Sequence, residues 1–137
     1  MIGLGIVRNT KGEVLIDQRL EAGVLAGFWE FPGGKQEPGE TIEQTIAREL
    51  LEELAISVAV ETHLISFEHS YGPKQLRFVV HLCRWLAGEP QPLESQQWRW
   101  VASDQLLKYN FPAANTRIIK AILELDAAGH GKAALPG

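Results

Sequence analysis

The sequence has little cysteine, little positive charge and no long apolar run. Its single cysteine, Cys83, excludes an intramolecular disulfide and the zinc sites that need several cysteines, and we interpret it as a small buried side chain. The 13 Lys and Arg residues are outnumbered by 17 Asp and Glu residues, for a formal net charge of −4. This balance argues against general binding to nucleic acid or anionic membranes. A polyanionic substrate would therefore need a bridging cation.

No window of the sequence approaches the roughly 20 apolar residues of a membrane span. Residues 1–7 carry neither the basic region nor the cleavage pattern of a secretion signal, so we expect a cytoplasmic protein without a membrane partner. The hydrophobic content of 45% fits one globular domain, which we place over residues 1–128. The small residues and glycines of 129–137 predict a disordered tail.

Strand patterns alternate with two substantial helical patterns along the chain. Strands are expected at 2–8 and 14–19 as a hairpin, at 57–67 and 75–86 as a long antiparallel pair, and at 97–101. A helical turn that Ser103 could cap is expected at 103–107, and a helix at 116–127. This order predicts an α/β or α+β sandwich with a mixed sheet between helices.

The stretch FPGGKQEPGETIEQTIARELLEEL, residues 31–54, contains the strongest helix signal. Thr41 and Gln44 form a capping-box pattern, so the helix should begin at residue 41 or 42. Apolar residues then recur every fourth position and predict a buried stripe, formed by Ile42, Ile46, Leu50 and Leu54.

Three glutamates lie beside that stripe, because Glu49, Glu52 and Glu53 are spaced i, i+3 and i+4. Two carboxylates about 6 Å apart repel by roughly 3 kcal/mol at an effective dielectric near 20, which raises their pKa values or favours a divalent cation. Mg²⁺ prefers such oxygen ligands together with substrate phosphates. The pair Gly33-Gly34 would let backbone atoms approach a metal or a phosphate. The alternative is a solvated glutamate face that Arg48 partly neutralises.

The segment resembles the Nudix box, whose pattern is G-x5-E-x7-R-E-U-x-E-E-x-G-U with U a bulky apolar residue. The first glycine of the pattern is Gly34, and every charged position is present, in Glu40, Arg48-Glu49 and Glu52-Glu53. Ala55 stands where the family has glycine. That glycine permits a left-handed turn after the helix, so alanine there should cost about 1 kcal/mol of strain.

The resemblance extends over nearly the whole chain and is to the MutT-type branch, on the stretches 5–9, 29–35 and 111–115. It implies an αβα sandwich and Mg²⁺-dependent hydrolysis of a nucleoside triphosphate, 8-oxo-dGTP above all, to the monophosphate and pyrophosphate, with Mn²⁺ as the other candidate metal. It also implies the metal ligands, namely Glu49, Glu52, Glu53, the carbonyl of Gly33 and Glu94. A solvated loop glutamate is the alternative for Glu94.

The remaining roles follow the same resemblance. Glu52 or Glu53 would be the general base, and Glu40 with Arg48 an orienting ion pair. Arg19 would contact the nucleotide, unless it is a solvated residue at the strand end. Gly34 and Lys35 lie in the box-flanking segment and would also bind substrate.

Recognition of the base can be argued from Asn115. Oxidation at C8 turns N7 of guanine into an N–H donor while O6 stays an acceptor, so one side-chain amide can pair with both atoms. Unoxidised guanine would leave a buried group unpaired, at a cost of about 1 to 3 kcal/mol. The alternative is that Asn115 only caps the last helix. Phe31, Tyr71 and Phe78 are candidates to wall the base, or else are simply core residues.

Three functions remain open on the sequence alone. They are an 8-oxo-dGTP hydrolase, a Nudix hydrolase for another nucleotide such as a pyrimidine triphosphate or ADP-ribose, and an inactive module that binds a nucleotide or a damaged base. The intact glutamates argue against the inactive module, and the lack of a basic stripe argues against stable nucleic-acid binding. We expect a monomer whose partner is a small nucleotide.

Overall fold

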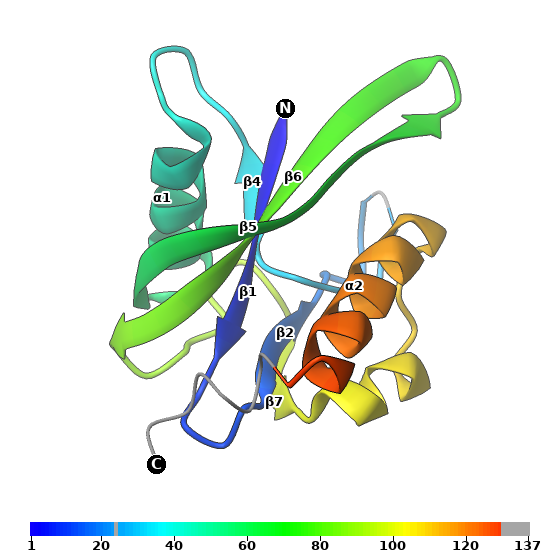
Figure 1. Cartoon of the computed structure of the whole chain (residues 1–137). Helices are drawn as coiled ribbons and strands as arrows, with labels where there is room; N and C mark the ends of the chain where they lie inside the picture. Colours follow the sequence, from blue (N-terminus) through cyan, green and yellow to red (C-terminus); the bar gives the residue numbers. More distant parts are fainter. Residues whose placement is uncertain (24, 130–137) are drawn as a thin grey trace.

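One mixed sheet carries a helix on each of its two faces (Figure 1). The computed structural model describes residues 1–23 and 25–129. Along the chain the elements are β1 (Ile2–Arg8), β2 (Val14–Gln18), β3 (Trp29–Glu30), β4 (Gly33–Lys35), α1 (Ile42–Leu54), β5 (Ser57–Tyr71), β6 (Lys74–Ala87), β7 (Gln97–Val101), the 3₁₀ turns η1 (Ser103–Lys108) and η2 (Ala113–Asn115), and α2 (Thr116–Ala127). This arrangement confirms the predicted fold class.

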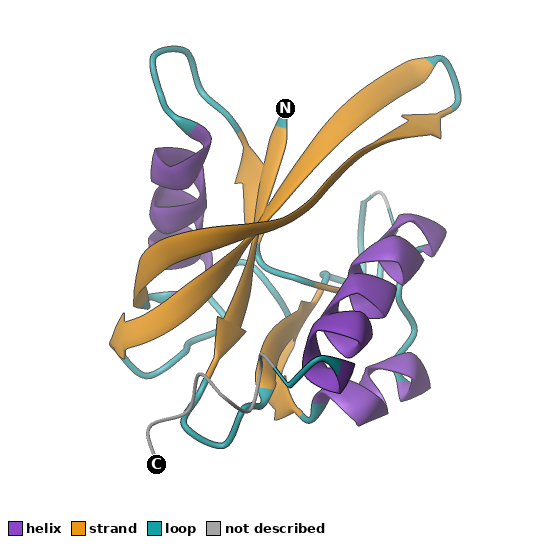
Figure 2. Ribbon diagram, in the orientation of Figure 1, coloured by secondary structure: helices purple, strands orange, loops and turns teal. Residues whose placement is uncertain are grey.

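The strand order is β3-β2-β1-β6-β5, with β4 paired to β1 and β7 paired to β2. β1 runs parallel to β6, with Leu4 opposite Val80, and the other pairings are antiparallel. β5 and β6 are longer than the sequence pattern predicted, and their hairpin extends beyond the rest of the sheet (Figure 2). Within residues 1–23 and 25–129, no helix is long and apolar enough to cross a membrane.

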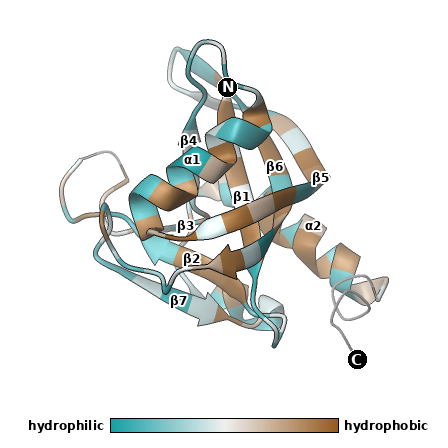
Figure 3. Ribbon diagram, turned by 90° about the vertical axis from the view of Figure 1, so that its left-hand side faces the viewer, coloured by the Kyte–Doolittle hydropathy of each residue, from teal (hydrophilic) through white to brown (hydrophobic). Residues whose placement is uncertain are grey.

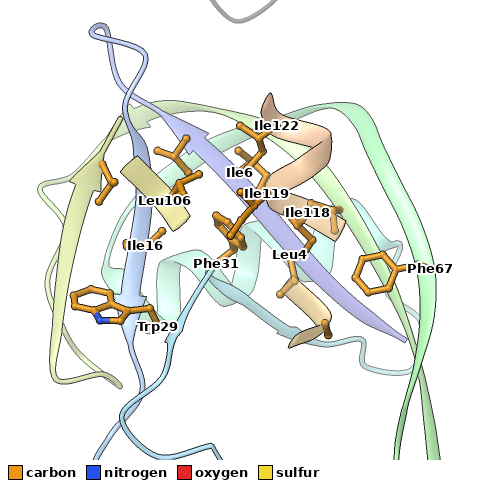
Figure 4. Packing of buried hydrophobic residues seen from close by; sticks show 14 residues of the cluster. Leu4, Ile6, Ile16, Trp29, Phe31, Phe67, Leu106, Ile118, Ile119 and Ile122 are labelled. Atoms are coloured by element: carbon orange, nitrogen blue, oxygen red, sulfur yellow. The ribbon is translucent and has the colours of Figure 1, made fainter. Parts of the chain in front are cut away.

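Each face of the sheet has its own hydrophobic core, because side chains alternate along the strands. On one face Ile46, Leu50 and Leu54 of α1 pack against Leu15 and the buried Cys83, and Figure 3 shows the apolar side of this helix turned to the strands. The other face packs against α2 and η1 and is shown in Figure 4. Its fully or nearly fully buried members include Ile6, Ile16, Phe31, Leu106, Ile118 and Ile122.

The predicted start and end of α1 are confirmed. Thr41 is the N-cap and forms the capping box with Gln44, in which each side chain accepts from the other residue's backbone N–H. At the other end Ala55 adopts the left-handed conformation, with φ 59° and ψ 29°, and its N–H donates to the carbonyl of Leu51. Alanine therefore fills the turn that glycine makes in the family pattern.

The expected cap by Ser103 is wrong. Ser103 is the first residue of η1, and its hydroxyl donates instead to Asp126 of α2. Arg8 lies 2.9 Å from the other oxygen of Asp126, so the serine joins an ion pair that ties α2 to β1. Residues 130–137 of the predicted tail lie outside the described residues, and the domain boundary at residue 128 stays a prediction.

Candidate active site

Two box glutamates face the glycine pair of β4. The N–H of Gly33 donates to Glu53 Oε1 over 3.0 Å. Gly34 lies against Glu49, and a Cβ at Gly34 would overlap the Glu49 carboxylate. A Cβ at Gly33 would overlap the carbonyl of Gly3, and Gly33 has φ 152°. Only glycine at these two positions lets β4 lie between β1 and the carboxylates of α1.

Arg48 organises the outer side of the same glutamates. Its Nε lies 2.6 Å from Glu40 Oε2, and its Nη1 lies 2.8 Å from Glu49 Oε1 and 3.2 Å from Glu52 Oε2. The Arg48 hydrogen bonds lower the pKa of Glu40 to about 2. The predicted ion pair of Glu40 and Arg48 is therefore present, and the guanidinium also contacts two of the three box glutamates.

The loop that carries Glu94 is tied to the end of α1 by backbone hydrogen bonds. The N–H of Leu93 donates to the carbonyl of Glu53 over 3.1 Å, and the N–H of Gln91 donates to that of Leu54 over 2.9 Å. Glu94 is exposed, and its charge adds a small part to the rise that burial causes in the pKa values of Glu49 and Glu53. The loop of Glu94 is therefore tied to the end of α1, and the role of Glu94 as a metal ligand stays a prediction.

The electrostatics of the box glutamates favour a bound cation. Burial, followed by the charge of Glu30, raises the pKa of Glu53 to about 9. Burial also raises the pKa of Glu49, although Arg48 opposes the shift. At neutral pH a carboxyl group in this setting either keeps its proton or gains a positive partner. Hard divalent cations bind carboxylate and backbone oxygens, and here the carboxylates lie beside the glycine backbone of β4. The donor set therefore fits such an ion.

Sequence reasoning missed two acidic residues that lie beside Glu53. Asp17 of β2 and Glu30 of β3 are opposite each other in the sheet, and oxygens of Asp17, Glu30 and Glu53 all lie within 4.8 Å of one another. Burial raises the pKa values of Asp17 and Glu30. One signal was available: Asp17 ends the run VLID, in which every residue is buried.

A cavity of about 470 Å³ opens next to these carboxylates. A cavity of this size falls in the range of small-ligand sites. Its lining includes most of the substrate residues proposed from the sequence, namely Arg19, Phe31, Gly34, Tyr71, Phe78 and Asn115. The lining also includes Glu30 and Gly33. Glu30 belongs both to the cavity lining and to the cluster with Asp17 and Glu53, so the cavity adjoins the carboxylates.

The cavity walls are partly aromatic and held by further contacts. Phe31 stacks on Phe111 with ring centroids 5.0 Å apart, and Phe78 stacks on Phe67 at 5.2 Å. Arg19 pairs with Glu30 at 2.9 Å, so it is not the solvated strand-end residue of the alternative interpretation.

Asn115 is 9% exposed and makes no side-chain cap of α2. The capping role that the sequence left open is therefore excluded. Lys35, by contrast, lies outside the lining of the cavity that the described residues form, and its carbonyl accepts a hydrogen bond from Arg48.

Comparison with known proteins agrees with this geometry. A profile of the NUDIX domain matches residues 3–121. An 8-oxo-dGTP diphosphatase of Haemophilus influenzae is 40% identical over 123 residues, which cover 89% of this chain and 90% of the relative. A CTP pyrophosphohydrolase of Escherichia coli is 33% identical over 121 residues, covering 85% and 87%. A solved MutT structure, from work on Aliivibrio salmonicida and Vibrio cholerae, superposes with a TM-score of 0.73 at 35% identity, covering 90% of this chain and 95% of that one.

Proposed function

The chain belongs to the Nudix family and is a Nudix hydrolase, and from this premise we propose that it hydrolyses 8-oxo-dGTP to 8-oxo-dGMP and pyrophosphate. Nudix hydrolases use a divalent metal ion, and we propose Mg²⁺, with Mn²⁺ as a substitute. Two relatives at 40% and 34% identity that bear the name 8-oxo-dGTP diphosphatase support the substrate. Such an activity removes an oxidised nucleotide from the precursor pool.

The observation that carries the substrate is the position of Asn115. Its side chain is nearly buried, lines the cavity and makes no capping hydrogen bond to α2. The amide can donate to O6 and accept from N7–H of 8-oxoguanine, a pairing that guanine cannot complete. Phe31 and Phe78, which line the same cavity, offer apolar walls for the base.

The phosphates would then lie toward β4 and α1. We propose that Glu49, Glu52, Glu53, Glu94 and the carbonyl of Gly33 hold the metal ions, which when bound neutralise phosphate charge and make a bound water more acidic. Arg19 is in place to contact a phosphate from the cavity wall. Glu52 offers a half-exposed carboxylate, so we propose that it accepts the proton of the attacking water. Arg48 and Glu40 orient these groups.

A second candidate substrate is a pyrimidine triphosphate. The relative named CTP pyrophosphohydrolase supports it, because it matches this chain over nearly the same length. Both candidates use the same carboxylates and differ only at the base. We further propose a monomer that acts on free nucleotide in the cytoplasm.

The test is a comparison of kcat/KM with Mg²⁺ for 8-oxo-dGTP, dGTP, CTP, dCTP and ADP-ribose. We expect a preference for 8-oxo-dGTP over dGTP that falls by about 5- to 150-fold in Asn115→Ala, which is the cost of one unpaired buried group. Asn110→Ala removes an exposed amide and serves as the matched control, and Glu53→Gln as the inactive one. Faster hydrolysis of CTP or ADP-ribose would overturn the substrate, and no Mg²⁺-dependent turnover on any of the five would overturn the activity.

A further inference from the structure

The carboxylates of Asp17, Glu30 and Glu53 meet from three different elements. Leu15 and Asp17 point to the same face of β2, the one that α1 covers, because side chains alternate along a strand. Glu53 reaches that point from the last turn of α1, and Glu30 reaches it from β3, opposite Asp17. The fold therefore places an acid where an apolar residue would continue the α1 core.

Asp17 is the unusual member of this group. Only 1% of its surface is exposed, and its Oδ1 accepts no hydrogen bond from any described residue. Its two neighbours do have donors, since Gly33 N–H donates to Glu53 and Arg19 donates to Glu30. A buried carboxylate oxygen without a donor is costly, so the group either keeps its proton or gains a positive partner, and a cation between the three carboxylates would be such a partner.

We propose that Asp17, Glu30 and Glu53 bind a divalent cation at a site distinct from the outer glutamates Glu49 and Glu52. Three carboxylates carry a charge of −3, and the guanidinium of Arg19 on Glu30 offsets one unit. The remainder matches a divalent ion. The oxygens lie within 4.8 Å of one another. Two ligand oxygens at the usual Mg²⁺ distance of about 2.1 Å are at most about 4.2 Å apart, so small side-chain rotations would close the three carboxylates onto one ion.

This site deepens the proposed function, on which it rests through the shared residue Glu53. It also connects the metal region to the nucleotide cavity, because Glu30 contacts Arg19 and both residues line that cavity. An ion held by Asp17 would fix the carboxylate of Glu30 and, through it, the guanidinium of Arg19. Asp17 is then a metal ligand and a positioning residue for Arg19.

The experiment measures metal binding without nucleotide. The full chain, stripped of metal, is titrated with Mn²⁺ while free Mn²⁺ is followed by electron paramagnetic resonance, in the wild type, Asp17→Asn, Glu30→Gln and Glu52→Gln. Asp17→Asn keeps the shape of the side chain and removes its charge. We expect Asp17→Asn and Glu30→Gln each to lose one bound Mn²⁺ or to weaken one site by about 10- to 100-fold. Glu52→Gln should keep that site.

Unchanged Mn²⁺ stoichiometry and affinity in both Asp17→Asn and Glu30→Gln would overturn the proposal. It would mean that Asp17 and Glu30 share a proton instead. Circular dichroism verifies that each variant is folded, and Glu30→Gln keeps the test open if Asp17→Asn does not fold. Because no nucleotide is present, a wild type that binds Mn²⁺ at this site but prefers CTP would overturn only the substrate, so the two proposals fail separately.

Discussion

Gly34 packs so closely against Glu49 that a methyl group on Gly34 would overlap the Glu49 carboxylate. This contact links the glycine of the Nudix box with the glutamate that follows Arg48, and the two lie 15 positions apart in the sequence. The glycine is needed for space, since its φ lies outside the left-handed region. Glu49 can therefore hold its place beside β4 only while residue 34 has no side chain.

Gly34→Ala should consequently displace the Glu49 carboxylate. We expect kcat/KM to fall by about 100-fold, because a shift of about 1 Å in a positioned group costs that much. Steady-state kinetics with Mg²⁺ and 8-oxo-dGTP measure the effect. Gly129→Ala is the control: its Cβ meets no heavy atom within 4 Å, and the strain from its φ of 84° falls beyond α2, away from the carboxylates. Equal kcat/KM in wild type and Gly34→Ala would show that the Glu49 position does not matter.

Ala55→Gly should stabilise the protein. Ala55 has a left-handed conformation that costs an L-residue about 1 to 2 kcal/mol, while glycine loses about 0.4 to 1 kcal/mol more chain entropy on folding. We therefore expect the free energy of unfolding to rise by roughly 0.5 to 1 kcal/mol, measured by urea denaturation. Ala47→Gly, in the interior of α1, is the matched control and should lower it by about 0.5 to 1 kcal/mol. A loss of stability in Ala55→Gly would contradict the strain assigned to this turn.

Much of the fold could be predicted because its signals are local. The capping box of Thr41 and Gln44, the apolar stripe of α1 and the carboxylate spacing all lie within 14 residues of one another. The signal for Asn115 is also local, because its role was predicted from residues 111–115 alone, and Asn115 does line the cavity. Local periodicity and motif spacing suffice for such elements.

Other features depend on contacts that no local pattern encodes. Asp17 and Glu30 meet Glu53 only because β2, β3 and α1 converge, and these residues are separated by up to 36 positions. Ser103 shows the same limit: its hydroxyl could cap a helix, but it donates a hydrogen bond to Asp126 instead. Tertiary contacts overrode local preference there.

The metal-free protein should lose stability as pH rises above about 5. The folded-state pKa of Glu53 is raised to about 9, and those of Asp17 and Glu30 are raised by burial, so the folded protein holds more protons than the unfolded chain in this window. The contribution of these three groups to the free energy of unfolding is then greatest below their unfolded pKa values of about 4 to 4.5 and falls toward pH 9, by at most about 1.4 kcal/mol per pH unit for each group.

Thermal melts in EDTA from pH 5 to pH 9 measure this dependence. Added Mg²⁺ should flatten it, because the cation takes the place of the protons. Glu53→Gln removes one titrating group and should reduce the slope in EDTA. Metal-free wild type that is as stable at pH 8 as at pH 5 would contradict the raised pKa values.

Arg48→Lys should impair turnover although the charge is kept. The Arg48 guanidinium donates to Glu40 through Nε and Nη2, and to Glu49 and Glu52 through Nη1. Its Nη2 also donates to the carbonyl of Lys35. An ammonium group has three donors at one point and cannot span these acceptors. We expect kcat/KM for 8-oxo-dGTP to fall by about 10- to 100-fold, as for loss of an outer residue that orients metal ligands.

The control for this change is Arg77→Lys. Arg77 lies on β6, half exposed, and its nearest acid is Glu68 at 3.9 Å, so the same substitution there alters no close contact. If Arg48→Lys retained wild-type kcat/KM, net positive charge alone would be sufficient at this position. If both variants lost activity equally, the effect would not be specific to the box. Loss in Arg48→Lys alone would show that the planar, multidentate geometry of arginine holds Glu40, Glu49 and Glu52 in place, which charge alone does not achieve.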